Sequence, residues 1–332
     1  MKIGWITSLL AASTMVHAIP QNATNYVETR AGCGELNQRV VSQFAHGQYA
    51  AAETLLSAAI ASGADRNRDT CAGFVLNNMA VLLSTSGRIT EAERLAERSV
   101  KILEAIYPPS DLVLLRPLSI LASMRFEQGK TAQAREVFKR MLLIRAERPE
   151  DRALVHATGA VLLEEEGRQS EAEAEYLATS RAWQEAGRED SADAGAVFTS
   201  LGSLYVKEQR FEEARQALDR ALTIFSLSKD AVPTDTIKVL NVRGVLQARQ
   251  GAWLEAEADL AKALSMADRE PWVDAIALRS LLTSYAYVLR KNHHRREART
   301  IEARAAGIRL DPAQSAIIDV TELLAKPKHP KK

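Results

Sequence analysis

Two short motifs contain residue types at spacings that could support chemistry. Ser226 and Lys229 have the S-x-x-K spacing of a serine nucleophile and its lysine. Asp65, Asn67 and Asp69 alternate like the first oxygen ligands of a calcium-binding loop. The first motif lies near the expected end of a helix and lacks its companion motifs. The second lacks the glycine and the bidentate glutamate that such a loop requires. We interpret them as a chance match and a polar loop.

Histidine and glutamate clusters are the remaining candidates. His293 and His294 are adjacent, so their side chains would diverge in a turn, and His156 occupies a bulky position of a core-facing pattern. Glu164 to Glu166 are consecutive, so in a helix they would fan out as a solvated face. Glycine-rich phosphate loops, metalloprotease His-Glu pairs and nucleophile elbows are not found. We therefore predict a non-enzymatic protein, with no catalytic residue, no cofactor and no metal.

The composition favours helices. The 332 residues are 46% hydrophobic but only 5% aromatic, and alanine, leucine, glutamate and arginine dominate. These residues lose little side-chain freedom in a helix. Val, Ile and Thr do not gather in alternating runs, so the sequence predicts an all-α fold with almost no strand.

The N-terminus predicts export. Residues 1–18 combine Lys2, an apolar stretch and small residues at Val16 to Ala18, which is typical of a signal peptide; a buried amphipathic helix is the alternative. Residues 19–32 read as a flexible leader. No later run of 18 apolar residues is present, so we expect no stable membrane insertion. The expected location is periplasmic or secreted.

The charge balance argues against nucleic acid as a partner. Without residues 1–18 the chain would keep 42 basic and 42 acidic residues, hence no net charge. The basic cluster is the tail at 326–332, where two prolines indicate a disordered end; weak contact with an anionic surface is the alternative.

A repeat of about 42 residues runs through the chain. Its marks are Gly47, Gly87, Gly129, Gly167, Gln209, Gly251 and His293, each followed after five residues by an alanine: Ala52, Ala92, Ala134, Ala172, Ala214, Ala256 and Ala298. Each unit fits two antiparallel helices. The mark ends the first helix in a left-handed conformation, and the alanine lies where two backbones come close. Apolar residues three, four and seven positions later give the second helix its buried stripe.

Phe198, Leu201, Gly202, Tyr205 and Ala214 resemble the tetratricopeptide repeat, with Phe in place of Trp. The long spacing is similar to the subtype of kinesin light chains and many bacterial repeat proteins. The resemblance implies a right-handed α-solenoid of about seven antiparallel helix pairs over 33–311, which 312–325 would cap. Arg243, Gln247, Arg125 and Gly159 depart from the family pattern and put local packing in doubt.

Two cysteines are expected to lie side by side. Cys33 and Cys71 fall at the starts of the first helices of adjacent repeats. In an exported protein this placement predicts a disulfide. Two buried free thiols are the alternative.

The resemblance also implies a concave groove lined by the first helices, where a partner protein or peptide binds. The helix positions that face the groove in that family correspond here to Phe74, Asn77, Ser84, Arg116, Ser123, Phe126, Glu127, Glu164, Thr199, Ser203, Lys207, Lys238, Asn241, Arg249, Ser280, Thr283, Tyr287 and Arg290. The basic residues in the C-terminal half favour an acidic segment or a chain terminus. The alternative is that each is an ordinary exposed helix residue.

Three functions remain open at this point. The first is a non-enzymatic scaffold that binds another protein in its groove. The second is a structural, self-associating module of an envelope assembly, which would oligomerise. The third, a hydrolase with a cryptic site, has no residue cluster to support it.

Overall fold

The computed structural model describes residues 33–63, 69–270, 273 and 275–308. In these ranges the chain is all-α apart from turns and a short 3-10 helix, Leu112–Leu114. The α-helices are α3 (Cys33–Ala45), α4 (Tyr49–Ala61), α5 (Thr70–Thr85), α6 (Ile89–Glu104), α7 (Leu115–Glu127), α8 (Thr131–Met141), α9 (Pro149–Glu165), α10 (Gln169–Glu185), α11 (Ala192–Lys207), α12 (Phe211–Leu227), α13 (Pro233–Gln250), α14 (Trp253–Ala267), α15 (Ala275–Lys291) and α16 (Arg295–Gly307).

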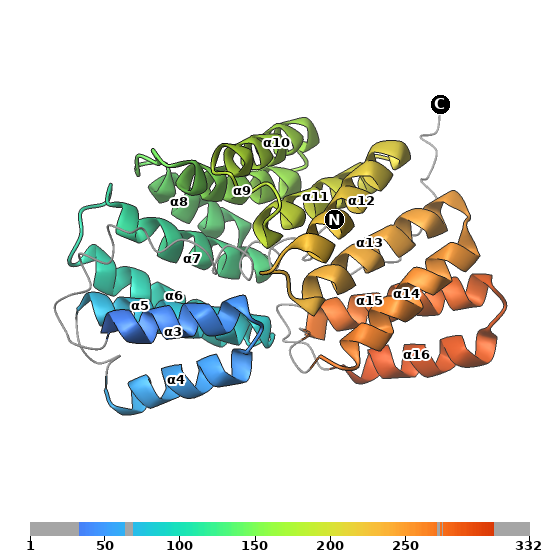
Figure 1. The fold of residues 1–332 in the computed structure, drawn as a ribbon, viewed down its shortest axis with the longest axis horizontal. Helices are drawn as coiled ribbons and strands as arrows, with labels where there is room; N and C mark the ends of the chain where they lie inside the picture. Colours follow the sequence, from blue (N-terminus) through green and yellow to red (C-terminus); the bar gives the residue numbers. More distant parts are fainter. Residues whose placement is uncertain (1–32, 64–68, 271–272, 274, 309–332) are drawn as a thin grey trace.

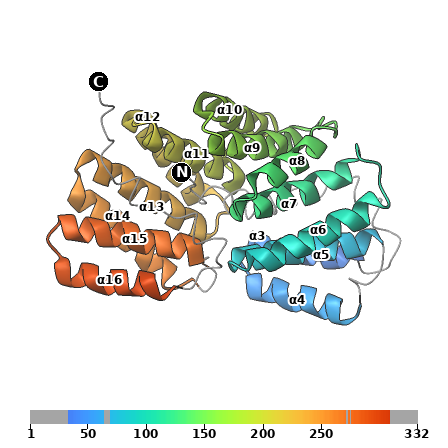
Figure 2. The ribbon, with the colours of Figure 1, turned by 180° about the vertical axis from the view of Figure 1, so that it is seen from behind.

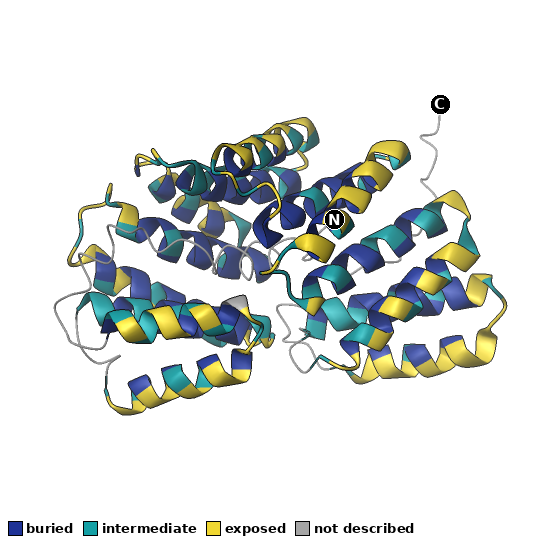
Figure 3. Cartoon of the chain, viewed as in Figure 1, coloured by how far each residue is buried: buried dark blue, intermediate teal, exposed yellow. Residues whose placement is uncertain are grey.

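The helices form seven pairs, from α3–α4 to α15–α16, in the order of an α-solenoid (Figure 1). The first helices contact one another at α3–α5, α5–α7, α7–α9, α11–α13 and α13–α15, whereas in the described ranges successive second helices lack contacts of this extent. The array therefore curves with its first helices on the tighter side, which we call the inner face. The second helices carry most of the exposed residues (Figure 3).

The predicted left-handed marks are confirmed. Gly47, Gly87, Gly129, Gly167 and Gly251 have positive φ angles, and so do Gln209 at 63° and His293 at 66°. These last two are the only non-glycine residues of the described chain with positive φ. All seven marks follow the end of a first helix, where a left-handed residue reverses the chain.

The paired alanines are also confirmed as points of close helix approach. Every one of the seven, from Ala52 to Ala298, has 0% of its surface exposed. Glycines on the first helices allow the same closeness: a Cβ on Gly202 would lie 2.6 Å from Leu218, and one on Gly244 would lie 2.7 Å from Leu260. Small residues on both helices thus let each pair pack tightly.

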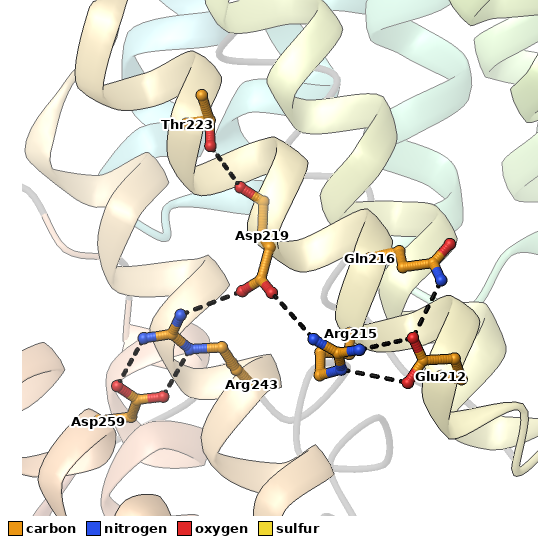
Figure 4. Close-up of polar contacts among 7 residues, drawn as sticks. All are labelled: Glu212, Arg215, Gln216, Asp219, Thr223, Arg243 and Asp259. Atoms are coloured by element: carbon orange, nitrogen blue, oxygen red, sulfur yellow. Dashed lines mark hydrogen bonds and ion pairs between the residues drawn. The ribbon is translucent and has the colours of Figure 1, made fainter.

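Two of the departures from the repeat pattern, Arg243 and Gly159, have compensations. Arg243 donates to both carboxylate oxygens of Asp259, at 2.7 and 2.9 Å, and reaches Asp219 at 3.3 Å (Figure 4). It thereby joins α12, α13 and α14. At Gly159 the space of the missing side chain is filled, because a Cβ there would lie 3.0 Å from the ring of Phe138.

The array closes on itself between repeats distant in sequence. A Cβ on Gly47, in the α3–α4 turn, would lie 3.4 Å from Val232, just before α13. A Cβ on Gly87, in the α5–α6 turn, would lie 3.9 Å from the Cβ of Ala275, at the start of α15. Figures 1 and 2 show these helix ends meeting at the centre of the molecule. Open solenoids contact only neighbouring repeats, so this closure is an additional constraint.

Several predicted segments lie outside the described residues. These are the signal peptide at 1–18, the leader at 19–32, the cap at 312–325 and the tail at 326–332. Among the helices that are described, none has the length and apolar character needed to cross a bilayer.

Candidate functional site

Most predicted groove residues lie on the inner face but are buried. The buried ones are Asn77, Ser84, Ser123, Phe126, Glu127, Glu164, Thr199, Ser203, Lys238, Asn241 and Ser280. The alternative that each is an ordinary exposed helix residue is therefore wrong for these positions. Phe126 belongs to the hydrophobic core. Phe74, Arg116, Lys207, Arg249, Thr283 and Tyr287 are half-buried, and Arg290 is exposed.

Two of the predicted groove cations are already paired. Lys207 forms an ion pair with Glu164, and Arg290 donates to both oxygens of Glu302, at 2.5 and 2.6 Å. Arg249 lies 5.9 Å from the ring of Phe211, and burial lowers its pKa. The basic character expected for the C-terminal half is therefore reduced.

Asn241 on α13 is the most unusual residue of the inner face. Its side chain is 1% exposed, and neither Nδ2 nor Oδ1 has a hydrogen-bond partner among the described residues. Asn77, which precedes its mark Gly87 by the same ten residues, is 7% exposed and has an unpaired Oδ1. A buried amide without partners is costly, because it loses its hydrogen bonds to water.

Threonines at the same position of other repeats are satisfied locally. Thr199 donates to the carbonyl of Gly195 at 3.0 Å, and Thr283 donates to that of Arg279 at 2.8 Å. Hydroxyls can bond back to the preceding helical turn in this way, whereas the amide of Asn241 does not. Asn241 is thus distinguished from its equivalents by its unmet capacity to donate and accept.

The expected solvated face of Glu164 to Glu166 is wrong for its first member. The Glu164 side chain is 3% exposed and accepts a hydrogen bond from the hydroxyl of Tyr176, at 2.9 Å, as well as pairing with Lys207. This buried cluster joins α9 and α10 to α11. Burial, with the charge of Glu164 nearby, raises the pKa of the Tyr176 hydroxyl, so that group is neutral.

A buried aspartate at the closure was missed by sequence reasoning. Asp235 is 4% exposed, and its Oδ2 accepts a hydrogen bond from the backbone N–H of Val232, at 3.1 Å, at the start of α13. Burial, together with the charges of Asp235 and Glu270, raises the pKa of Tyr49 on α4. Asp151 and Asp193 precede Asp235 at intervals of 42 residues and are also buried. This periodicity was the available signal.

Asp235 gives the protein a pH-dependent stability. Burial, which outweighs the nearby charge of Lys238 and the hydrogen bond from Val232, raises its pKa from 3.8 to about 6. Between these values the folded protein binds a proton that the unfolded chain does not, so stability rises as pH falls. We expect a gain of about 1–1.5 kcal/mol between about pH 7.5 and about pH 5.

Urea denaturation at the two pH values measures this gain. Asp235→Asn should remove the increase, since the variant has no proton to bind at that position. An equal pH dependence in wild type and variant would contradict the assignment.

Cys33 and Cys71 form a disulfide in the structure, with a Cα–Cα distance of 6.0 Å. Their positions at the starts of α3 and α5 are those expected from the repeat. The bond joins the first helices of the first two pairs.

The other chemical motifs form no site among the described residues, and Asp65 and Asn67 lie outside them. Ser226 donates to the carbonyl of Thr223 at 2.7 Å, and Asp69 caps α5 by accepting from the N–H of Ala72 at 2.9 Å. His156 is hydrogen-bonded to Glu175, and His294 to Glu257. Across the described ranges, no three His, Cys, Asp or Glu residues are grouped so that they could hold a metal ion.

Known proteins support the repeat architecture. Residues 75–111, from α5 to the turn after α6, and residues 196–226, in α11–α12, each match the tetratricopeptide repeat family. The fold is similar to that of BtubC from P. vanneervenii, with a TM-score of 0.50 and 21% identity over 77% of this chain and 95% of that chain. A tetratricopeptide repeat protein from Parabacteroides merdae gives a TM-score of 0.39 and 15% identity over 75% and 96%. None of the curated proteins matches the sequence.

Proposed function

We propose that this chain, which contains tetratricopeptide repeats, is a protein-interaction scaffold that binds an extended segment of a partner protein along its inner face. Tetratricopeptide repeats serve protein interaction in general, and the two matched repeats give the chain that character. That the partner binds along the inner face is the specific part of the proposal.

Asn241 is the observation that carries the proposal. A side-chain amide has donors and an acceptor, as a peptide bond has one of each, so it can hold the main chain of an extended segment by paired hydrogen bonds. The same side chain is 1% exposed and unpaired within the described residues. Asn77 provides a second amide in the same position of its repeat.

Charge indicates the kind of segment. Lys238 precedes Asn241 by one helical turn. An ammonium group one turn from an amide favours carboxylates, so the proposed segment is acidic or ends in a free carboxylate.

Affinity capture tests the proposal. Because the chain begins with a predicted export signal, cell-envelope extract is the proposed source of partner. Wild type should retain a partner that Asn241→Leu loses, since leucine has similar volume but cannot hydrogen-bond. The matched control is Asn78→Leu, because Asn78 already donates to Asn37 at 2.7 Å and should keep the partner. Equal capture by wild type and Asn241→Leu would reject the inner face as the binding surface.

A further inference from the structure

The amide proposed to bind a partner is covered. Asn241 is 1% exposed, and Lys238 and Ser203 on the same face are each 8% exposed. A partner segment cannot reach these groups in the closed molecule. Binding therefore requires part of the structure to move.

The closure is the contact best placed to move. It joins helix pairs that are not neighbours, whereas the extensive helix contacts of the described ranges lie within one pair or between neighbouring pairs. On one side are the α3–α4 and α5–α6 turns, and on the other are Val232 and Ala275. The two residues of one contact lie 185 positions apart in the sequence, and those of the other lie 188 positions apart. Both contacts therefore join the same two parts of the array with nearly the same offset.

The two turns can move together. The disulfide between Cys33 and Cys71 links α3 covalently to α5, so the first two helix pairs form one cross-linked unit. A single displacement of this unit would release Gly47 from Val232 and Gly87 from Ala275. The small side chains at both contacts allow close seating without interlocking.

We infer that the seating of the α3–α4 and α5–α6 turns on the starts of α13 and α15 is a latch that controls access to the inner face. The latch rests on the proposed function only in naming the inner face as the surface whose access it controls. Opening it exposes the amides of α5 and α13, and closing it covers them.

Two variants should fix the latch closed or open without changing a residue of the inner face. Gly87→Cys with Ala275→Cys should lock it, because the 3.9 Å separation of the β-carbons lies within disulfide range. Ala275→Phe should hold it open, because the larger side chain has no room beside Gly87.

Accessibility is read from a thiol introduced at the inner face. Ser203→Cys, in each background, is treated with a maleimide under native conditions, and the reference carries Ala275→Cys alone, which cannot cross-link. Ser170→Cys is the control, since Ser170 is exposed on α10. We expect Ala275→Phe to speed labelling at position 203, and the locked pair to slow it, by about tenfold each. Labelling at position 170 should not change.

Equal labelling at position 203 in the cross-linked pair, the Ala275→Phe variant and the reference protein would overturn the latch. A locked pair that fails to form its cross-link, together with unchanged labelling in the folded Ala275→Phe variant, would overturn it as well. Because no partner takes part in this experiment, failure of the latch is distinguishable from failure of the proposed binding function.

Discussion

Replacing Glu164 with alanine is expected to destabilise the protein by about 3–5 kcal/mol, because it removes one partner of a buried ion pair. The change leaves the ammonium of Lys207, which is 16% exposed, without its carboxylate. It also leaves the hydroxyl of Tyr176 without its acceptor, on a side chain that is 0% exposed. Both groups would then be desolvated without the carboxylate that they share.

Urea denaturation measures the loss, and hydrogen exchange locates it in α9–α11, since repeats transmit destabilisation to their neighbours. Glu164→Gln keeps an acceptor for Tyr176 and should be less damaging. The double variant Glu164→Leu with Lys207→Met removes both charges and should recover much of the stability. A loss below about 1 kcal/mol for Glu164→Ala would show that the pair is solvated.

Loss of the disulfide is the second large effect. Its sulfurs join residues 38 positions apart, and closing a loop of that length stabilises the fold by about 3–4 kcal/mol in the chain-entropy model. Cys33→Ala with Cys71→Ala should therefore lower the free energy of unfolding of α3–α6 by this amount. The distant pairs α9–α12 should keep their protection from hydrogen exchange.

The thiol count decides whether the bond is present in the mature protein. Denatured, unreduced protein should contain no free thiol. Two free thiols would instead support the alternative of two buried, unbonded cysteines. The double alanine variant would then lower the free energy of unfolding much less.

The regular part of the fold could be predicted from the sequence because it is local. A left-handed residue must end each first helix, so even Gln209 and His293 could be placed by their spacing, and their φ angles agree. The alanines followed from the closeness of two backbones, and each is fully buried. Such features depend on residues within one repeat.

The closure and the buried cluster could not be predicted in the same way. The contact of Gly87 with Ala275 depends on curvature summed over several repeats, which no single repeat encodes. Glu164 was misplaced because its partner Lys207 is 43 residues away, on another repeat. The groove residues are predicted from their positions along each helix. Such a position gives the face of the helix on which a residue lies, but not which other parts of the chain cover that face.

The proposed role of Asn241 implies that this side chain is kept for a partner at the expense of stability. The free energy of unfolding of Asn241→Leu should be measured on the same preparation that is used for capture. Leucine removes a buried amide that has no partner, so the variant should be more stable by about 1–3 kcal/mol while it loses the partner. A variant that is less stable than wild type would show that Asn241 serves the fold and is not kept for a partner.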